Sequence, residues 1–124
     1  MLIKDFFEII SSELINDNEL STSVSINPDH KIFKGHFPEN PVVPGVVSVQ
    51  MINEILSHHL KVSLMTSSAR SIKFISMIDP RVNPDLMFNI KFSETERDNF
   101  KVTAQVNFEE TVFLKFNGAF EVIP

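Results

Sequence analysis

A histidine in a proline-rich segment is the first candidate for chemistry. His36 lies within residues 27–44, which hold four of the chain's seven prolines. Prolines at this density restrict the backbone, so the imidazole would be held in a fixed pose. The ordinary pKa of histidine, about 6.5, lets the side chain take up and return a proton near neutral pH. His36 is therefore a candidate general base or acid.

The next segment predicts a helix with its polar residues on one face. Residues 46–60 contain no proline or glycine and are mostly apolar, which predicts a helix buried on nearly all sides. Gln50, Glu54 and His58 are spaced four residues apart and so share one stripe. Gly45 stands at the entry to this helix, where the first N–H groups lack intrahelical partners and carry the positive end of the helix dipole. We therefore expect an anion-binding helix start beside a polar stripe.

The rest of the chain has the composition of β-strands. Residues 20–26 alternate between apolar and polar types, whereas residues 1–15 fit a helix or the other arm of a hairpin. Four further segments are rich in strand-forming residues and are separated by turn residues: 71–78, 86–94, 100–108 and 111–123. This order predicts an α+β fold in one domain, residues 1–124, in which a curved antiparallel sheet of about six strands wraps one central helix at about residues 45–60.

The composition argues against several other kinds of site. The chain has no cysteine, and its four histidines do not show the spacing of zinc ligands, so we expect no metal and no cofactor. A net charge of −5 argues against binding to nucleic acid or to anionic membranes. The N-terminus lacks the pattern of a signal peptide, and no apolar run reaches the ~20 residues of a membrane span, so we expect a cytoplasmic protein.

One segment resembles a known family. Residues 33–47, FKGHFPENPVVPGVV, resemble the HFPG-x-PV-x-PGV signature of the bacterial 3-hydroxyacyl-(acyl carrier protein) dehydratases, which have the hot-dog fold. Residues 72–92 are similar to that family's strand, proline-containing turn and strand, so the resemblance covers most of the chain from about Leu20 onward. The N-terminus lacks the His-Arg-Tyr-Pro-Phe stretch that is usual in the closest members.

The resemblance implies an activity and an assembly. It implies a lyase that removes water from 3-hydroxyacyl thioesters of acyl carrier protein or coenzyme A, giving the trans-2-enoyl thioester, in fatty-acid or related acyl-chain synthesis. It also implies a homodimer or higher homo-oligomer with the site at the subunit interface. A basic rim is expected to attract the acidic carrier protein. The candidates for this rim are Lys31, Lys34, Arg70, Lys73 and Arg81.

The resemblance also assigns roles to individual residues. His36 would take the proton from C2, and the N–H of Val46 would bond the thioester carbonyl, with Gly45 letting the substrate approach the backbone. Phe37 and Pro44 would contact the substrate beside them.

The family's acid, a Glu or Asp on the helix, falls at the position of Gln50. An amide cannot deliver a proton as a carboxylic acid does. Glu54 stands where the closest members have a glutamine, and because helical side chains lean toward the N-terminus it could reach back over Gln50 and act as the acid. We therefore treat His36, Glu54 and Gln50 as the catalytic candidates.

Two other functions remain open at this point. Gln50 fits a protein that binds acyl thioesters without turnover, or the non-catalytic subunit of a heteromeric dehydratase. Glu54 could instead activate water for thioester hydrolysis, as helix carboxylates do in hot-dog thioesterases.

Overall fold

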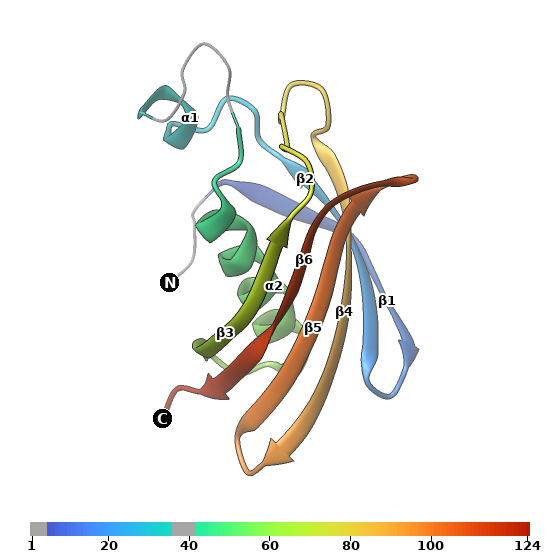
Figure 1. Cartoon of the computed structure of the whole chain (residues 1–124), viewed down its shortest axis with the longest axis vertical. Helices are drawn as coiled ribbons and strands as arrows, with labels where there is room; N and C mark the ends of the chain where they lie inside the picture. The colour runs from blue at the N-terminus through green and yellow to red at the C-terminus, as the bar shows by residue number, and fades with distance from the viewer. Residues whose placement is uncertain (1–4, 36–41) are drawn as a thin grey trace.

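One curved sheet around one long helix makes up most of the molecule. The computed structural model of the chain describes residues 5–35 and 42–124. The strands form one antiparallel sheet in the order β1-β2-β4-β5-β6-β3, which wraps around α2 (Figure 1). The elements are β1 (Phe7–Asn16), β2 (Glu19–Ile26), α1 (Ile32–Gly35), α2 (Gly45–Leu60), β3 (Leu64–Phe74), β4 (Asp85–Glu96), β5 (Asn99–Phe108) and β6 (Thr111–Val122). The α+β architecture that the sequence predicts is confirmed.

The first two strands form the hairpin that the sequence allowed. Residues 7–16 and 19–26 pair antiparallel across a short turn, which resolves the ambiguity of the N-terminal segment in favour of a strand. Along β2, alternate residues are buried, as the period-2 pattern predicts. Thr22, which is fully buried, satisfies its hydroxyl through Ser12, with 2.9 Å between the two oxygens.

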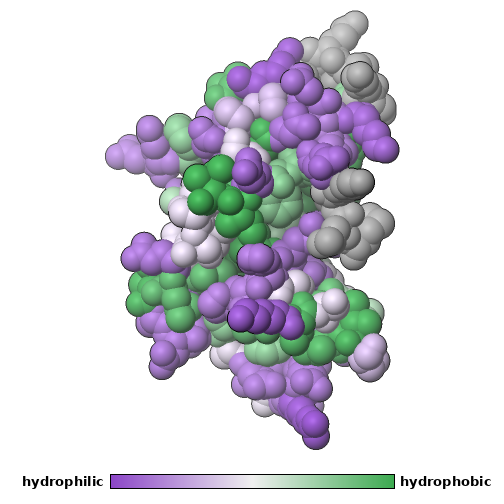
Figure 2. All heavy atoms as spheres, turned by 180° about the vertical axis from the view of Figure 1, so that it is seen from behind, coloured by the Kyte–Doolittle hydropathy of each residue, from purple (hydrophilic) through white to green (hydrophobic). Residues whose placement is uncertain are grey.

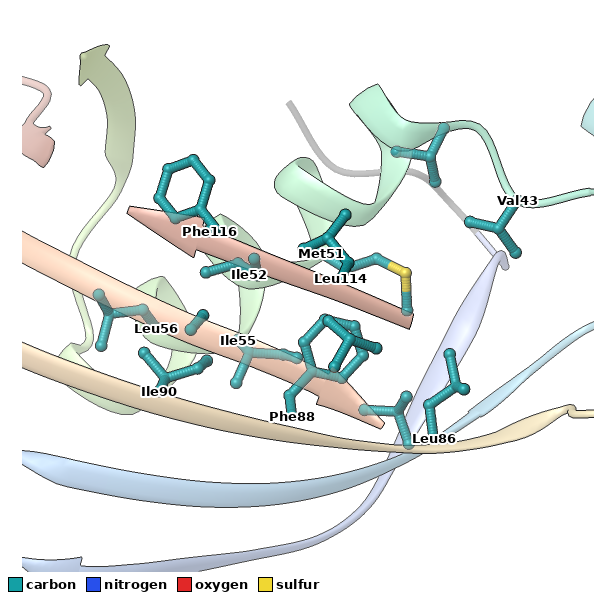
Figure 3. Packing of buried hydrophobic residues seen from close by; sticks show 14 of the residues in the cluster. Val43, Met51, Ile52, Ile55, Leu56, Leu86, Phe88, Ile90, Leu114 and Phe116 are labelled. Carbon is teal, nitrogen blue, oxygen red and sulfur yellow. The ribbon is translucent and has the colours of Figure 1, made fainter. Parts of the chain in front are cut away.

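The core lies between α2 and the concave face of the sheet. Met51, Ile52, Ile55 and Leu56 on the helix are almost completely buried. Figure 3 shows them beside residues of β4 and β6, including Phe88 and Ile90 on β4 and Leu114 and Phe116 on β6. Burial of a side chain of this size stabilises the fold by roughly 1.5–3 kcal/mol, so the core fixes the position of α2 over the sheet.

Two boundaries differ from the sequence prediction. The strand predicted at residues 71–78 in fact spans Leu64–Phe74. Its first half was missed because β3 is an edge strand with most of its residues exposed, which removes the alternation that reveals a strand. Residues 75–78 are mostly apolar because they line a hollow described below, not because they continue the strand. The segment 27–44, predicted to be irregular throughout, contains the short helix α1.

The prediction that the central helix is buried on nearly all sides is wrong. Val46 is 77% exposed and His58 is exposed, while Gln50 and Glu54 between them are only partly buried. These four residues are spaced four apart, so a single chain leaves one stripe of α2 uncovered. We call Val46, Gln50, Glu54 and His58 the open stripe. No helix in the described residues is long and apolar enough to cross a membrane.

Candidate active site

The start of α2 presents free backbone donors. Pro44 caps the helix with an extended backbone (φ −61°, ψ 144°), and its carbonyl accepts hydrogen bonds from Val47 N (3.0 Å) and Ser48 N (3.2 Å). The N–H groups of Gly45 and Val46 bond no other residue that the structure describes. Because the first turn also carries the positive end of the helix dipole, these two groups can stabilise negative charge on a ligand oxygen.

An apolar hollow of about 440 Å³ opens beside these donors. Its walls come from the segment before α2, from the first turn of the helix, from the end of β3 and the residues after it, and from the start of β6. They are Val42, Val43, Pro44, Gly45, Ser48, Phe74, Ile75, Ser76, Met77, Ile78, Phe113 and Leu114. Two of its lining residues are phenylalanines, Phe74 and Phe113. The hollow suits an acyl chain whose polar end lies at the helix start.

Gly45 allows a close contact with the end of β3. A Cβ atom on residue 45 would collide with the aromatic ring of Phe74. The glycine therefore lets the end of β3 approach the helix, and Phe74, which remains 62% exposed, forms part of the hollow's mouth.

A second, polar hollow lies further along the same helix. Its volume is about 890 Å³, and it runs between the second half of α2, the start of β3 and the end of the chain. Gln50 and Glu54 both line it, which confirms that they face one space. The other lining residues are Asn53, Ser57, His58, Lys61, Val62, Ser63, Leu64 and Ile123. Gln50 and Glu54 therefore line the polar hollow, whereas Gly45, at the helix start, lines the apolar one.

Asn53 fixes the helix beside these candidates. It is only 5% exposed, and its amide donates to Leu64 O at 2.9 Å while its oxygen accepts from Ser57 Oγ at 3.0 Å. The bond to Leu64 O joins α2 to the first residue of β3 and sets the position of the helix relative to the sheet edge, while the bond from Ser57, within α2, holds the Asn53 side chain. Among the described residues there is no cluster of three or more potential metal ligands.

The turn that borders the apolar hollow is held by an ion pair. Arg81 Nε and Nη2 donate to the Asp79 carboxylate at 3.3 and 3.2 Å, and the Arg81 backbone N–H donates to it at 2.9 Å. The Arg81 side chain therefore lowers the pKa of Asp79. A lowered carboxyl pKa stabilises the folded turn above the group's ordinary pKa, and that contribution is lost as the pH falls through the lowered value. Arg81, expected at a basic rim, is at least partly neutralised by this contact.

The structure places some of the predicted site residues and not others. Pro44, Gly45 and Val46 come together at the helix start, and Gln50 and Glu54 lie on one side of the helix. His36 and Phe37 lie outside the described residues, so their predicted roles stay predictions.

Sequence reasoning missed other residues of the apolar hollow. Ser48, 1% exposed, is three residues after Gly45, and helical spacing could have placed it on the same face. Phe74 and Met77 come from a distant part of the chain, and nothing in their local pattern reveals that they meet the helix.

A curved antiparallel sheet around one long helix defines the hot-dog class of folds, and solved structures of that class match the chain along nearly its whole length. The model of the ApeI-like family, described as ApeI dehydratase, matches residues 12–116. The chain therefore belongs to the ApeI-like dehydratase family. No curated protein sequence matches it significantly.

Three solved structures illustrate the likeness. A chain of the dehydratase heterocomplex ApeI:P from Xenorhabdus doucetiae matches with a TM-score of 0.74 at 20% identity, covering 94% of this chain and 97% of that one. A hypothetical thioesterase with coenzyme A from Streptococcus pneumoniae gives 0.66 at 13% identity, covering 98% and 91%. A mutant thioesterase from Pseudomonas aeruginosa gives 0.63 at 11% identity, covering 94% and 81%. At these identities the likeness shows the fold.

Proposed function

We propose that the protein is a dehydratase that converts 3-hydroxyacyl thioesters of acyl carrier protein or coenzyme A into trans-2-enoyl thioesters, in fatty-acid or related acyl-chain synthesis. The observation that carries the proposal is the apolar hollow at the start of α2, where the N–H groups of Gly45 and Val46 are available beside a wall suited to an acyl chain. Membership of the ApeI-like family supports the same reaction class.

The reaction needs three groups. Loss of the C2 proton leaves an enolate whose charge gathers on the thioester oxygen, and N–H donors at a helix start stabilise such an oxyanion. His36 takes the C2 proton, because a neutral imidazole is a base of suitable strength near pH 7. The departing C3 hydroxyl needs a proton donor, and Glu54 in its protonated form provides one, with Gln50 holding the hydroxyl by a hydrogen bond.

The dimensions of α2 indicate that these groups come from two chains. Val46 and Glu54 are eight residues apart, which is about 12 Å along a helix axis. The carbonyl carbon C1 of the thioester and the hydroxyl-bearing carbon C3 are separated only by the carbon C2, so one helix cannot reach both groups. A second chain packed against the open stripe would bring its own Glu54 toward the first chain's helix start. We infer that the active form is a dimer, or a larger oligomer, with the site at the interface.

Gln50 favours a second candidate function. If Glu54 does not act as the acid in place of Gln50, the chain binds acyl thioesters without turnover or serves as one subunit of a heteromeric dehydratase. The dehydratase heterocomplex ApeI:P of Xenorhabdus doucetiae is a precedent for the heteromeric form. Thioester hydrolysis is a third outcome that the same assay distinguishes.

The test is a parallel assay of four proteins: wild type, His36→Ala, Glu54→Gln and Gln50→Glu. Each receives 3-hydroxyacyl and enoyl thioesters, and enoyl formation, hydration and release of free thiol are followed together. We expect wild type to interconvert the two thioesters, and His36→Ala and Glu54→Gln to lose about 100-fold or more in kcat.

Each alternative gives a different result. Full turnover by Glu54→Gln together with loss in His36→Ala contradicts the role of Glu54 as the acid. Release of thiol without enoyl formation identifies a thioesterase. If wild type shows no turnover and Gln50→Glu does, the site is degenerate. If wild type and every variant show no turnover, the chain is a binding protein or a partner subunit.

A further inference from the structure

Two lysines lie directly opposite each other on the outer face of the sheet. Lys73 on β3 pairs in register with Lys115 on β6, and both side chains are exposed. Like charges opposite each other in a sheet reduce stability. Neither lysine forms an ion pair with any residue that the structure describes. The fold therefore tolerates an uncompensated positive pair at this edge.

The residues in the same row of the outer face carry no negative charge. Gln105 on β5 is the other neighbour of Lys115, and Asn89 on β4 is the next residue in that row, so no carboxylate lies beside the lysines there. A shallow outer hollow of about 360 Å³ lies over these strands, with Lys91 and Lys115 in its lining. The acidic residue of that lining, Glu19, pairs in register with Lys91 and also accepts a hydrogen bond from the Asn16 amide at 3.3 Å. Lys91 therefore has a carboxylate directly opposite it, unlike Lys73 and Lys115.

The lysine pair lies close to the apolar hollow. Phe74 follows Lys73 and Leu114 precedes Lys115, and both of these neighbours line the apolar hollow. Successive residues of a strand point to opposite faces, so the lysines mark the outside of the wall whose inside holds the acyl site. Whatever binds the lysine pair is therefore within a short distance of the hollow's mouth.

We propose that Lys73 and Lys115 dock the acidic surface of the carrier protein that delivers the acyl thioester. This inference rests on the proposed function and names the carrier's contact surface. The chain carries a net charge of −5 and would repel an acidic partner unless positive residues gather where the partner binds.

The test compares Lys73→Glu/Lys115→Glu, and each of its two single variants, with two control charge reversals, Lys101→Glu and Arg97→Glu, which match the single variants in net charge. Lys101 is on the same outer face, and Arg97 is in the turn at the opposite end of the strands from Phe74 (Figure 1). Each protein is assayed with carrier-bound, coenzyme A-bound and N-acetylcysteamine-bound 3-hydroxyacyl substrate, at low and high ionic strength. Direct binding of the carrier protein is measured by calorimetry, and circular dichroism checks the fold.

We expect the double variant to lose about tenfold or more in kcat/KM and in carrier affinity at low ionic strength, with a much weaker salt dependence. Its turnover of the N-acetylcysteamine substrate should equal that of wild type, and both control variants should stay within about twofold on every substrate. Unchanged carrier affinity overturns the proposal. An equal loss with the coenzyme A substrate also overturns it, because the lysines would then recognise the phosphate.

The two proposals fail separately in this design. If wild type turns over none of the three substrates, the proposed function is wrong, and calorimetry with the carrier protein still tests the lysine surface. If all substrates are turned over and the double variant binds the carrier as wild type does, the surface is wrong and the dehydratase proposal stands.

Discussion

Gly45 combines two requirements at a single residue. The proposed role requires the backbone to approach the substrate closely, and the same position must leave room for the ring of Phe74. The ring is largely exposed, so it can turn aside if a methyl group is added. The absence of a side chain at residue 45 therefore affects both the approach of substrate to the backbone and the shape of the hollow.

We predict that Gly45→Ala keeps the fold and loses function. Displacing an exposed ring should change the free energy of unfolding by less than about 1 kcal/mol, because surface changes usually cost little. The displaced ring reshapes the hollow's mouth, so kcat/KM should fall about tenfold or more. Urea unfolding and the dehydration assay measure the two effects. The double variant Gly45→Ala/Phe74→Ala should regain most of the turnover, and its failure to do so would show that crowding by the ring is not the cause.

Individual site residues could be predicted from sequence where the chemistry depends on neighbours in the chain. Pro44, Gly45 and Val46 are at the helix start as expected, and Gln50 and Glu54 face one space because helical spacing alone determines it. The residues that complete the apolar hollow from β3 and β6 could not be predicted, because strand pairing brings them in from distant parts of the chain.

At the scale of elements, burial decides which strands the sequence reveals. β2 was predictable because one face is buried and the other is not. The predicted bounds of β3 were wrong for two reasons. An edge strand with two exposed faces has no such alternation, so its first half was missed. Residues 75–78 beyond it are mostly apolar because they line the hollow, so they were wrongly included. The candidate site lies at the end of β3, beside the start of α2, so it adjoins the part of the chain whose strand boundaries were predicted wrongly.

Asn53 provides a test of how elements hold the site. We predict that Asn53→Leu reduces the free energy of unfolding by about 1–3 kcal/mol, because Leu64 O loses its donor in a buried position. Ser57→Ala is the matched control, since it removes one hydrogen bond to Asn53 and leaves the link between α2 and β3 intact. Urea unfolding of both variants makes the comparison. Equal losses in the two variants would contradict the role of Asn53 as the link.

At the scale of the whole molecule, the two long edges of the sheet differ. Both edge strands have register shifts, β1 at Ile9/Ser11 and Leu14/Asn16 and β3 at Thr66/Ser68 and Ala69/Ser71, so bulges do not distinguish the two edges. The β3 edge lies beside the open stripe, and large hydrophobic residues are exposed on this side, among them Val46, Phe74 and Met77. The face in Figure 2 shows green hydrophobic patches among purple polar residues. Exposed apolar surface of this kind favours association with another chain.

A mixing experiment tests whether two chains share one site. His36→Ala and Glu54→Gln, each expected to be inactive alone, are unfolded together and refolded at equal concentrations. If His36 and Glu54 of one site come from different chains, half of the dimers are mixed, and each mixed dimer has one intact site of two. Turnover should then return to about a quarter of the wild-type value. Each variant refolded alone is the control, and native mass spectrometry counts the mixed dimers. Mixed dimers without turnover would place His36 and Glu54 of each site in the same chain, and the two-chain site would be wrong.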